Sequence, residues 1–271
     1  MSLDTIVIGG GLFGRVVAKH LTRLGQDVLV VDANREHAGS KPAACLMKPS
    51  WFSSLGKDVY EPSLELLNDL YGVQDLSFKV GPVKMDGVHW IPPGSILDDK
   101  EYRVIHDEIV NVEPGVVRNA HGYRHEAKTV VVAAGAWTSQ LVNVPGLTGR
   151  AGAAFLWPGI TLTEPFISPW APYRQLVAFN RGDGMWVGDG TAIKPENWSM
   201  DREAQSRDRC ARAVQNPAKA PKTLYGVRPY VPKAKPAFLM LARGLCVATG
   251  GAKNGTLAAG WCAKQIGDFL S

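Results

Sequence analysis

Three glycines near the start of the chain have the spacing of a phosphate-binding turn. Gly9, Gly11 and Gly14 follow the pattern Gly-x-Gly-x-x-Gly, and Asp32 lies 18 residues after the last of them. Gly9 permits a tight turn, Gly11 lets the backbone approach a pyrophosphate, and Gly14 lets a helix pack closely on a strand. A carboxylate at the position of Asp32 is typical of the group that hydrogen-bonds a ribose hydroxyl. The pattern therefore indicates a dinucleotide site.

The neighbouring residues predict the elements that such a turn requires. Residues 5–8 and 28–32 are apolar and predict strands, and the residues between them have the apolar spacing of a helix. This helix would begin beside Leu12 and Phe13 and would point its free N–H groups and its positive dipole end at the phosphates. A glycine turn in an α/β domain that binds nothing is the alternative.

Composition limits the class of protein. The 271 residues are 45% hydrophobic and 20% charged, enough for one large domain or two interleaved ones. No apolar run reaches about 20 residues, so we expect no membrane span and no secretory signal. The four cysteines and six histidines show no metal-binding spacing, so we expect no metal and a cytoplasmic protein with reduced thiols. The net charge of +5 is compatible with nucleic acid, but a solvated basic face is the preferred interpretation.

The remaining segments predict an α/β core interrupted by antiparallel strands. Thr129 to Val132 form a β-branched run that is typical of a strand buried in a parallel sheet. Residues 245–249 predict another strand, followed by a glycine-rich turn and a last helix. Short segments cut by Gly and Pro, over residues 77–91 and 150–235, favour antiparallel strands. We therefore expect an α/β fold: a Rossmann-like dinucleotide-binding domain (residues 1–72, 105–148 and 236–271) with an interleaved, mostly antiparallel substrate domain (residues 73–104 and 149–235).

Further segments match one protein family in type and order. Residues 44–49 form a small-residue loop, and residues 130–137 form an apolar strand that runs into Ala-Ala-Gly-Ala-Trp. Residues 226–232 read Gly-Val-Arg-Pro-Tyr-Val-Pro, and residues 248–255 form a glycine-rich entry to the last helix. Together with the N-terminal turn, they make the chain resemble the FAD-dependent oxidoreductases of the D-amino-acid oxidase, glycine oxidase and sarcosine oxidase superfamily. The resemblance implies that the Rossmann-like part is an FAD-binding domain that holds FAD non-covalently.

The resemblance also implies which residues contact FAD. Ile109 corresponds to the place where the family's backbone contacts adenine, although a plain buried strand residue is an equal alternative. A helix that begins within residues 250–257 would aim partial positive charge at the pyrimidine edge of the flavin and favour its reduced form. The expected cofactor-binding residues are Gly9, Gly11, Leu12, Phe13, Gly14, Asp32, Ala44, Cys45, Leu46, Ile109, Ala134, Gly135, Trp137, Gly250, Gly251, Asn254, Gly255 and Thr256.

Arg228 and Lys253 are the expected catalytic residues. In amino-acid oxidases of this type, the arginine of the Gly-x-Arg-Pro turn pairs with the substrate carboxylate, which a guanidinium can bind through two parallel N–H donors. An arginine that satisfies backbone carbonyls is the alternative for Arg228. Lys253 would stabilise superoxide near the flavin, with a surface lysine as the alternative. Tyr173, Tyr225 and Tyr230 are candidate phenol donors.

The expected reaction is oxidation of the C–N bond of a small amino acid or secondary amine, by hydride transfer to flavin N5. The electron acceptor would be oxygen or another, unknown molecule. Four departures affect this expectation. Cys45 stands where glycine is common, Gly251 replaces a frequent histidine, and the substrate region looks short. Residues 232–236 read Pro-Lys-Ala-Lys-Pro where the family usually continues with Pro-Asp-Gly-x-Pro. Because of these departures, a flavin-binding partner subunit with little turnover stays open as an alternative. A tRNA-modifying flavin oxidase is a second alternative, because the loop at residues 44–49 resembles that branch and the chain is basic.

Overall fold

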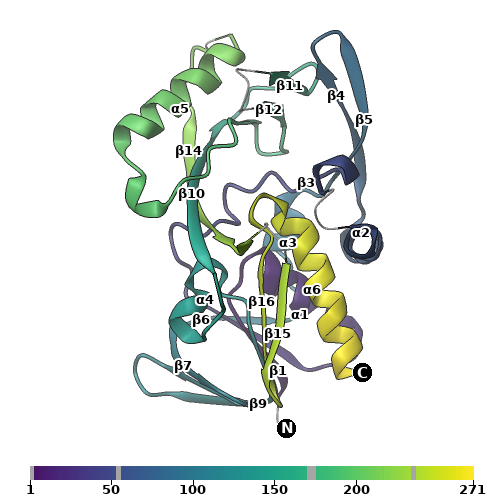
Figure 1. Cartoon of the computed structure of the whole chain (residues 1–271), viewed down its shortest axis with the longest axis vertical. Coiled ribbons are helices and arrows are strands. Elements are labelled where there is room, and N and C mark those ends of the chain that lie inside the picture. The colour runs from purple at the N-terminus through teal and green to yellow at the C-terminus, as the bar shows by residue number, and fades with distance from the viewer. Residues whose placement is uncertain (1–2, 53–55, 170–174, 216, 233–235) are drawn as a thin grey trace.

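The structure, a computed structural model, describes residues 3–52, 56–169, 175–215, 217–232 and 236–271. These residues form two sheets that lie in opposite halves of the molecule (Figure 1). Both chain ends of the described part lie in the half that holds the first sheet.

The first sheet has a parallel centre. Its strand order is β15-β16-β9-β1-β2-β6, and β1 pairs in parallel with both β2 and β9. Val130, Val131 and Val132 in β9 are fully buried, as their β-branched run predicted. The β7–β8 hairpin extends this sheet from β9. The strands are β1 (Leu3–Ile8), β2 (Val28–Asp32), β6 (Arg103–His106), β7 (Ile109–Glu113), β8 (Val116–Asn119), β9 (Arg124–Val132), β15 (Pro236–Ala242) and β16 (Leu245–Gly250).

The second sheet is almost entirely antiparallel. Its order is β14-β10-β13-β12-β11-β4-β5-β3, and its one parallel pair within the described residues joins β4 to β11. The long strands β10 and β14 run from this sheet toward the first one (Figure 1). The strands are β3 (Leu46–Met47), β4 (Gln74–Val80), β5 (Val83–Trp90), β10 (Thr148–Trp157), β11 (Phe166–Pro169), β12 (Gln175–Asn180), β13 (Met185–Gly188) and β14 (Lys222–Tyr230).

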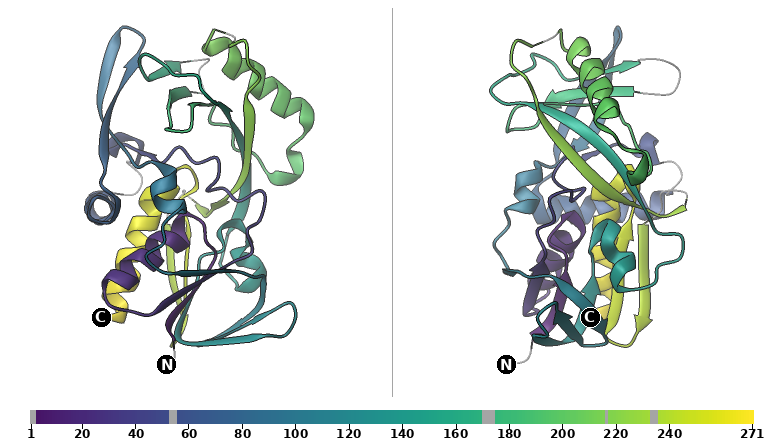
Figure 2. Two further views of the ribbon diagram at one scale, coloured as in Figure 1. Left: turned by 180° about the vertical axis from the view of Figure 1, so that it is seen from behind. Right: turned by 90° about the vertical axis from the view of Figure 1, so that its left-hand side faces the viewer.

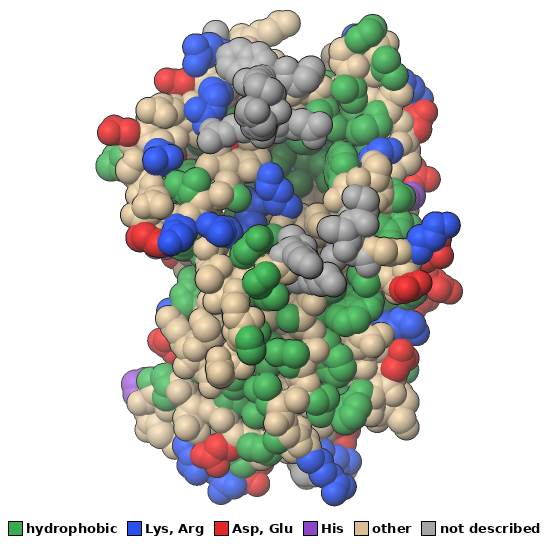
Figure 3. All heavy atoms as spheres, viewed as in Figure 1, with side chains coloured by type: hydrophobic (Ala, Val, Ile, Leu, Met, Phe, Trp, Pro, Cys, Tyr) green, Lys and Arg blue, Asp and Glu red, His purple; other side chains and the backbone are tan. Residues whose placement is uncertain are grey.

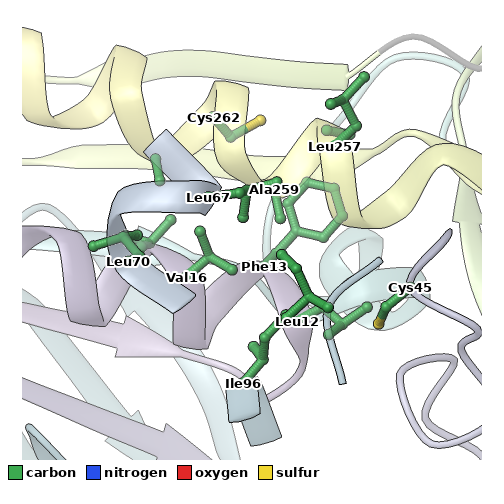
Figure 4. Close-up of a cluster of buried hydrophobic side chains, with 14 of the residues drawn as sticks. Leu12, Phe13, Val16, Cys45, Leu67, Leu70, Ile96, Leu257, Ala259 and Cys262 are labelled. Atoms are coloured by element: carbon green, nitrogen blue, oxygen red, sulfur yellow. The ribbon is translucent and has the colours of Figure 1, made fainter. Parts of the chain in front are cut away.

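Three helices, α1 (Leu12–Arg23), α2 (Lys57–Tyr71) and α6 (Gly255–Leu270), pack together beside the first sheet. Phe13 of α1, Leu67 of α2 and Leu257 of α6 belong to one buried hydrophobic cluster (Figure 4). Gly260 permits the close contact between α2 and α6, because a Cβ there would lie 2.9 Å from Cγ of Leu67. The last helix, α6, therefore buries apolar side chains of the first helix, α1.

The other helices are shorter or lie on the second sheet. In Figure 2, α5 (Met200–Ala213) lies along β10 and β14, on the side away from the β4–β5 hairpin. Ser199 caps α5, since its hydroxyl accepts a hydrogen bond from the Arg202 N–H at 3.3 Å. The remaining elements are α3 (Pro93–Leu97), α4 (Thr138–Leu141) and the 3-10 turns η1 (Pro49–Phe52), η2 (Gly135–Trp137), η3 (Pro195–Asn197) and η5 (Ala252–Asn254). None of the helices in the described ranges combines the length and the apolar character needed to cross a bilayer.

The predicted turn at residues 226–232 is wrong, because residues 222–230 form strand β14. Pro229 would interrupt a central strand, but β14 lies at the edge of its sheet, where a missing N–H is tolerated. The expected division into domains stays a prediction. One detail differs from it: Leu46 and Met47 lie in the segment assigned to the dinucleotide-binding part, yet they pair with β5 of the second sheet.

Candidate functional site

A cavity of about 880 Å³ is lined by residues of both sheets. The first sheet contributes the carboxyl ends of its parallel strands, including Ile8, Val31 and Gly250. The second sheet contributes Ala154 of β10 and Trp186 of β13. In α/β sheets, ligands bind outside the carboxyl ends of parallel strands, so the cavity has the expected place for a cofactor. Its volume lies within the range of small-molecule sites, about 300–1,000 Å³.

The glycine turn forms one wall of this cavity. Gly9 has a φ of +106°, and a Cβ there would lie 2.5 Å from the Ala133 carbonyl oxygen. A Cβ on Gly14 would lie 1.8 Å from the Gly9 carbonyl oxygen, so this position admits no other residue without a backbone shift. Arg15 supports the turn from behind, because its Nε donates to the Gly10 carbonyl oxygen at 2.9 Å. The turn is therefore fixed by close packing and by a side chain of its own helix.

Ser40, in the loop after β2, contacts the first residue of α1. Its hydroxyl oxygen accepts a hydrogen bond from the Leu12 N–H at 2.9 Å, and it also lines the cavity. No spacing in the sequence pointed to Ser40. The missing signal is understandable, because the contact joins residues 28 positions apart in an irregular loop.

Asp32 and a set of charged residues line another part of the cavity wall. The Asp32 carboxylate packs against the glycine turn, since a Cβ on Gly10 would lie 2.8 Å from its Oδ2. Arg35 donates from Nη2 to Oε1 of Glu108 at 2.7 Å, and its guanidinium lies over the Trp137 ring, 5.3 Å from the centroid. The pair therefore joins the loop after β2 to the loop before β7.

The small-residue loop holds Cys45 in an unusual conformation. Its φ is +53°, in the left-handed region that favours glycine, and its side chain is buried. Burial raises the pKa of the Cys45 thiol to about 11, although a hydrogen bond with Thr256 acts in the opposite direction. The thiol is therefore neutral at physiological pH. The left-handed φ explains why glycine would fit this position.

The start of α6 faces the same cavity. Gly250 and Gly251 both have positive φ, of 89° and 73°, and they turn the chain from β16 into the helix. Lys253, Asn254 and Thr256 line the cavity, and Lys253 is exposed. The free N–H groups of this helix start lie where they can donate to a bound ligand.

Arg228 lines the cavity from strand β14. Its Nη2 donates to the Thr191 carbonyl oxygen at 3.5 Å, and within the described part of the chain no carboxylate forms an ion pair with it. Burial lowers the pKa of the guanidinium, and the charge of Asp189 partly offsets this effect. Asp189 itself is engaged elsewhere, since it accepts hydrogen bonds from Arg209 and Ser206 of α5. Arg228 thus places a cation at the cavity wall, and the guanidinium has further N–H donors that can bind a ligand.

The cavity brings together most of the residues that the sequence singled out. Gly14 and Gly251 do not line it, and both are packed against backbone or side-chain atoms instead. Tyr225 and Tyr230 also lie outside its wall, and Tyr173 falls outside the described residues. Whether the lining residues bind a cofactor stays a prediction. Those that line it are Gly9, Gly11, Leu12, Phe13, Asp32, Ala44, Cys45, Leu46, Ile109, Ala134, Gly135, Trp137, Arg228, Gly250, Lys253, Asn254, Gly255 and Thr256.

The surface shows where the basic residues lie. Figure 3 shows Lys and Arg side chains gathered over the part of this face that α5 and β14 occupy.

The described residues contain no group of three or more His, Cys, Asp or Glu side chains placed to hold a metal ion. All four cysteines are described, and each is free and buried.

Two models of known protein families match the sequence. The model of the family described as FAD dependent oxidoreductase matches residues 94–269, and that described as pyridine nucleotide-disulphide oxidoreductase matches residues 3–177. No curated protein matches the sequence at a significant level.

Solved structures share the fold. Glycine oxidase from Geobacillus kaustophilus is similar with a TM-score of 0.76 at 15% identity, covering 99% of this chain and 94% of that one. Iminodiacetate oxidase from Chelativorans sp. BNC1 is similar with a TM-score of 0.72 at 15% identity, covering 96% and 93%. L-proline dehydrogenase from P. horikoshii gives a TM-score of 0.63 at 15% identity, covering 99% and 94%. At this level of identity the likeness concerns the fold alone.

Proposed function

Because the chain belongs to the FAD dependent oxidoreductase family, we propose that it oxidises the C–N bond of a small amino acid or secondary amine that carries a carboxylate. FAD is its cofactor, and the cavity that opens at the glycine turn is where we place it. Among the four cysteines, Cys45 lines this cavity, and its raised pKa keeps it a neutral thiol rather than a nucleophile, which supports non-covalent binding.

The lining residues fit the parts of FAD. The positive dipole end of α1 at the glycine turn suits a pyrophosphate, with the Leu12 N–H already donated to Ser40, and Asp32 suits a ribose hydroxyl. The N–H groups at the start of α6 suit the electron-rich pyrimidine edge of a flavin. Every one of these groups belongs to the same cavity wall.

One observation carries the choice of substrate. Arg228 faces the cavity without a carboxylate partner among the described residues, while the nearby Asp189 is already bound by Arg209. A partly buried cation without a carboxylate partner is costly, and an anionic ligand would reduce that cost. A substrate carboxylate fits, because a guanidinium can hold both of its oxygens in a fixed geometry.

The chain's own residues would do little acid–base chemistry. The flavin supplies the redox chemistry when it is bound, by accepting a hydride from the substrate Cα. Arg228 would orient the substrate by its carboxylate, and Trp186 and Ala154 would exclude water from the reacting carbon. The amine nitrogen would release a proton as the C=N bond forms, and water would then hydrolyse the imine to an oxo acid and ammonia or an amine. Oxygen, reduced to hydrogen peroxide, is our proposed acceptor, with Lys253 as the cation beside it.

The test is anaerobic addition of glycine, sarcosine, proline and a panel of D-amino acids to the FAD-loaded protein. We expect the visible flavin bands to bleach with at least one of them. In Arg228→Met, the substrate concentration for half-maximal bleaching should rise roughly 10- to 100-fold, because charge-assisted hydrogen bonds are lost.

Arg150→Met is the matched control. Arg150 lies opposite Arg228 in the β10–β14 ladder, stacks on Tyr230 and does not line the cavity. Equal losses in both variants would contradict the assignment of Arg228. Flavin bands that no amine bleaches would reject the proposed reaction and favour a flavin-binding partner subunit or an RNA-directed oxidase.

A further inference from the structure

The loop over residues 41–44 is held by side chains from two strands of the second sheet and from the turn after β12. Arg181 donates from Nη1 to the carbonyl oxygen of Lys41 at 3.0 Å and to that of Ala43 at 3.5 Å. The indole Nε1 of Trp186 donates to the Pro42 carbonyl oxygen at 3.1 Å, and that of Trp90 donates to the Ala44 carbonyl oxygen at 3.1 Å. Four consecutive carbonyls therefore accept hydrogen bonds from three side chains, which we call the loop clamp.

The members of the loop clamp are themselves fixed. The Arg181 guanidinium forms a two-pronged pair with Asp183, through Nε to Oδ1 at 2.9 Å and Nη2 to Oδ2 at 2.5 Å. This hydrogen bonding lowers the pKa of Asp183. The Trp90 and Trp186 rings lie on Phe179, with centroids 5.9 and 5.4 Å from its own. Donors anchored in this way lose little conformational entropy when they bind the loop.

The clamped loop lies on the cavity wall. Pro42, Ala43 and Ala44 line it, together with Cys45 and its left-handed φ of +53°. A residue held in this region costs about 1–3 kcal/mol and persists only where its surroundings enforce it. Within the described residues, the N–H groups of Ala44 and Cys45 have no hydrogen-bond acceptor. With the carbonyls taken by the second sheet, the N–H groups are the polar atoms that this part of the loop has left for a ligand.

We propose that Trp90, Trp186 and Arg181 are positioning residues for FAD. They act through the loop: by binding its carbonyls, they hold it in the conformation that contacts the cofactor, and they tie the sheet on the substrate side to the cofactor cavity. The proposal rests on FAD occupying this cavity and does not depend on which substrate is oxidised.

A variant of Trp90 can distinguish action through the loop from direct contact of a side chain with FAD. Trp186 lines the cavity and could touch FAD itself, whereas the Trp90 side chain does not line it and donates its hydrogen bond to the Ala44 carbonyl of the loop. The strand pairing of Trp90 with Leu46 is a backbone contact, which Trp90→Phe leaves in place. Trp90→Phe keeps an aromatic ring against Phe179 and removes the N–H donor. Trp198→Phe is the control, because Trp198 packs on Tyr225, outside the cavity wall, and its indole has no hydrogen bond among the described residues.

The first readout is the reaction of Cys45 with iodoacetamide in the full-length protein freed of FAD, followed by peptide mass spectrometry. We expect labelling to be at least five times faster in Trp90→Phe and Trp186→Phe than in Trp198→Phe. The second readout is the dissociation constant of FAD from flavin fluorescence. It should rise about five- to tenfold for each lost hydrogen bond, and the visible circular dichroism of the bound flavin should change.

Three results would overturn the proposal. One is Cys45 protection and FAD affinity in Trp90→Phe equal to those of the control. Another is weaker FAD binding with unchanged Cys45 labelling, which would indicate direct contact rather than action through the loop. The third is a variant Arg181→Gln that folds and leaves both readouts unchanged; this variant also serves if a tryptophan variant does not fold. No substrate enters these measurements, so their failure is distinct from failure of the proposed reaction.

Discussion

The Nη2 of Arg209 lies 2.6 Å from Oδ2 of Asp189, so a residue of α5 engages the carboxylate whose charge acts on Arg228. Asp189 also accepts hydrogen bonds from the Ser206 hydroxyl and the Thr191 N–H, both at 2.9 Å. Burial alone would raise the pKa of Asp189, but these hydrogen bonds outweigh burial and hold it below its ordinary value. Asp189 thus stays charged without needing Arg228.

Removal of Arg209 should therefore impair ligand binding at Arg228. In Arg209→Met, Asp189 keeps its charge but loses its main cation, and we expect it to attract the Arg228 guanidinium. The affinity for a carboxylate substrate should fall about tenfold, as for the loss of one charge-assisted hydrogen bond. Substrate titrations of the FAD-loaded protein measure this change.

Arg207→Met provides the comparison, since Arg207 is exposed on the same helix. The double variant Arg209→Met/Asp189→Asn should recover part of the affinity, because no carboxylate then competes for Arg228. An unchanged affinity in Arg209→Met would show that Asp189 and Arg228 do not compete.

Cys45 should make the free energy of unfolding depend on pH in the alkaline range. Its pKa is about 11 in the folded protein and 9.0 as the ordinary value, so the folded state keeps the thiol proton over this range. Stability from this group is fully present below pH 9 and is lost as the pH rises from 9 to 11, because the unfolded chain releases the proton first. We expect Cys45→Ala to lose less stability than the parent protein between pH 8.5 and 10.5 in urea unfolding. Parallel curves for the two proteins would contradict the assigned pKa.

Gly14→Ala should strongly destabilise the protein. Its Cβ would lie 1.8 Å from the Gly9 carbonyl oxygen, a backbone atom that cannot move without opening the glycine turn. We expect a loss of about 3 kcal/mol or more in the free energy of unfolding, at the upper end for overpacked sites. Gly255→Ala is the control for the FAD-free protein, because its Cβ would meet only a Phe13 ring carbon at 4.0 Å. Urea unfolding of both variants should separate them clearly.

Lys19 of α1 forms a buried ion pair with Asp99. Its Nζ lies 2.9 Å from Oδ2 of Asp99, whose side chain is 4% exposed, and 3.0 Å from Oε1 of Glu101. Lys19→Met would leave the Asp99 charge without its partner and should cost about 3–5 kcal/mol of unfolding free energy. Lys84→Met removes an exposed pair with Asp86 and should change stability by less than about 1 kcal/mol. A similar small effect in both would show that Asp99 is solvated.

The sequence predicted the strands and turns around the cavity well, because local rules govern them, whereas the binding of a cofactor there stays a prediction. Glycine spacing, apolar strand runs and helix starts act over a few residues, and the predicted segments around Gly9, Asp32, Val130 and Gly250 meet at one cavity. Membership of the flavin family is confirmed by the family model. The expected location in the cytoplasm stays a prediction.

Contacts between residues far apart in the chain could not be predicted from the sequence. The contact between Arg181 and Lys41 joins residues 140 positions apart, and no periodicity marks either residue. The pairing of Asp189 with Arg209 depends on how α5 lies against β10, which the pattern of a charged helix does not specify. Arg228 was found by family resemblance, yet its strand was mistaken for a turn, since Pro229 is compatible with both.

The packing of α6 on α1 affects how the protein must be made. Phe13 of α1 is covered in part by a helix that begins 242 residues later, at Gly255. At about 5–20 residues per second, a ribosome takes roughly 12–50 s to supply that cover. During this time the apolar face of the first helix is open to chaperones or to other nascent chains. Thr256 of α6 lines the cavity in which we propose that FAD binds, so on that proposal the flavin would be loaded only after translation has passed Thr256. Cells short of FAD should then accumulate a folded but less stable form of the chain.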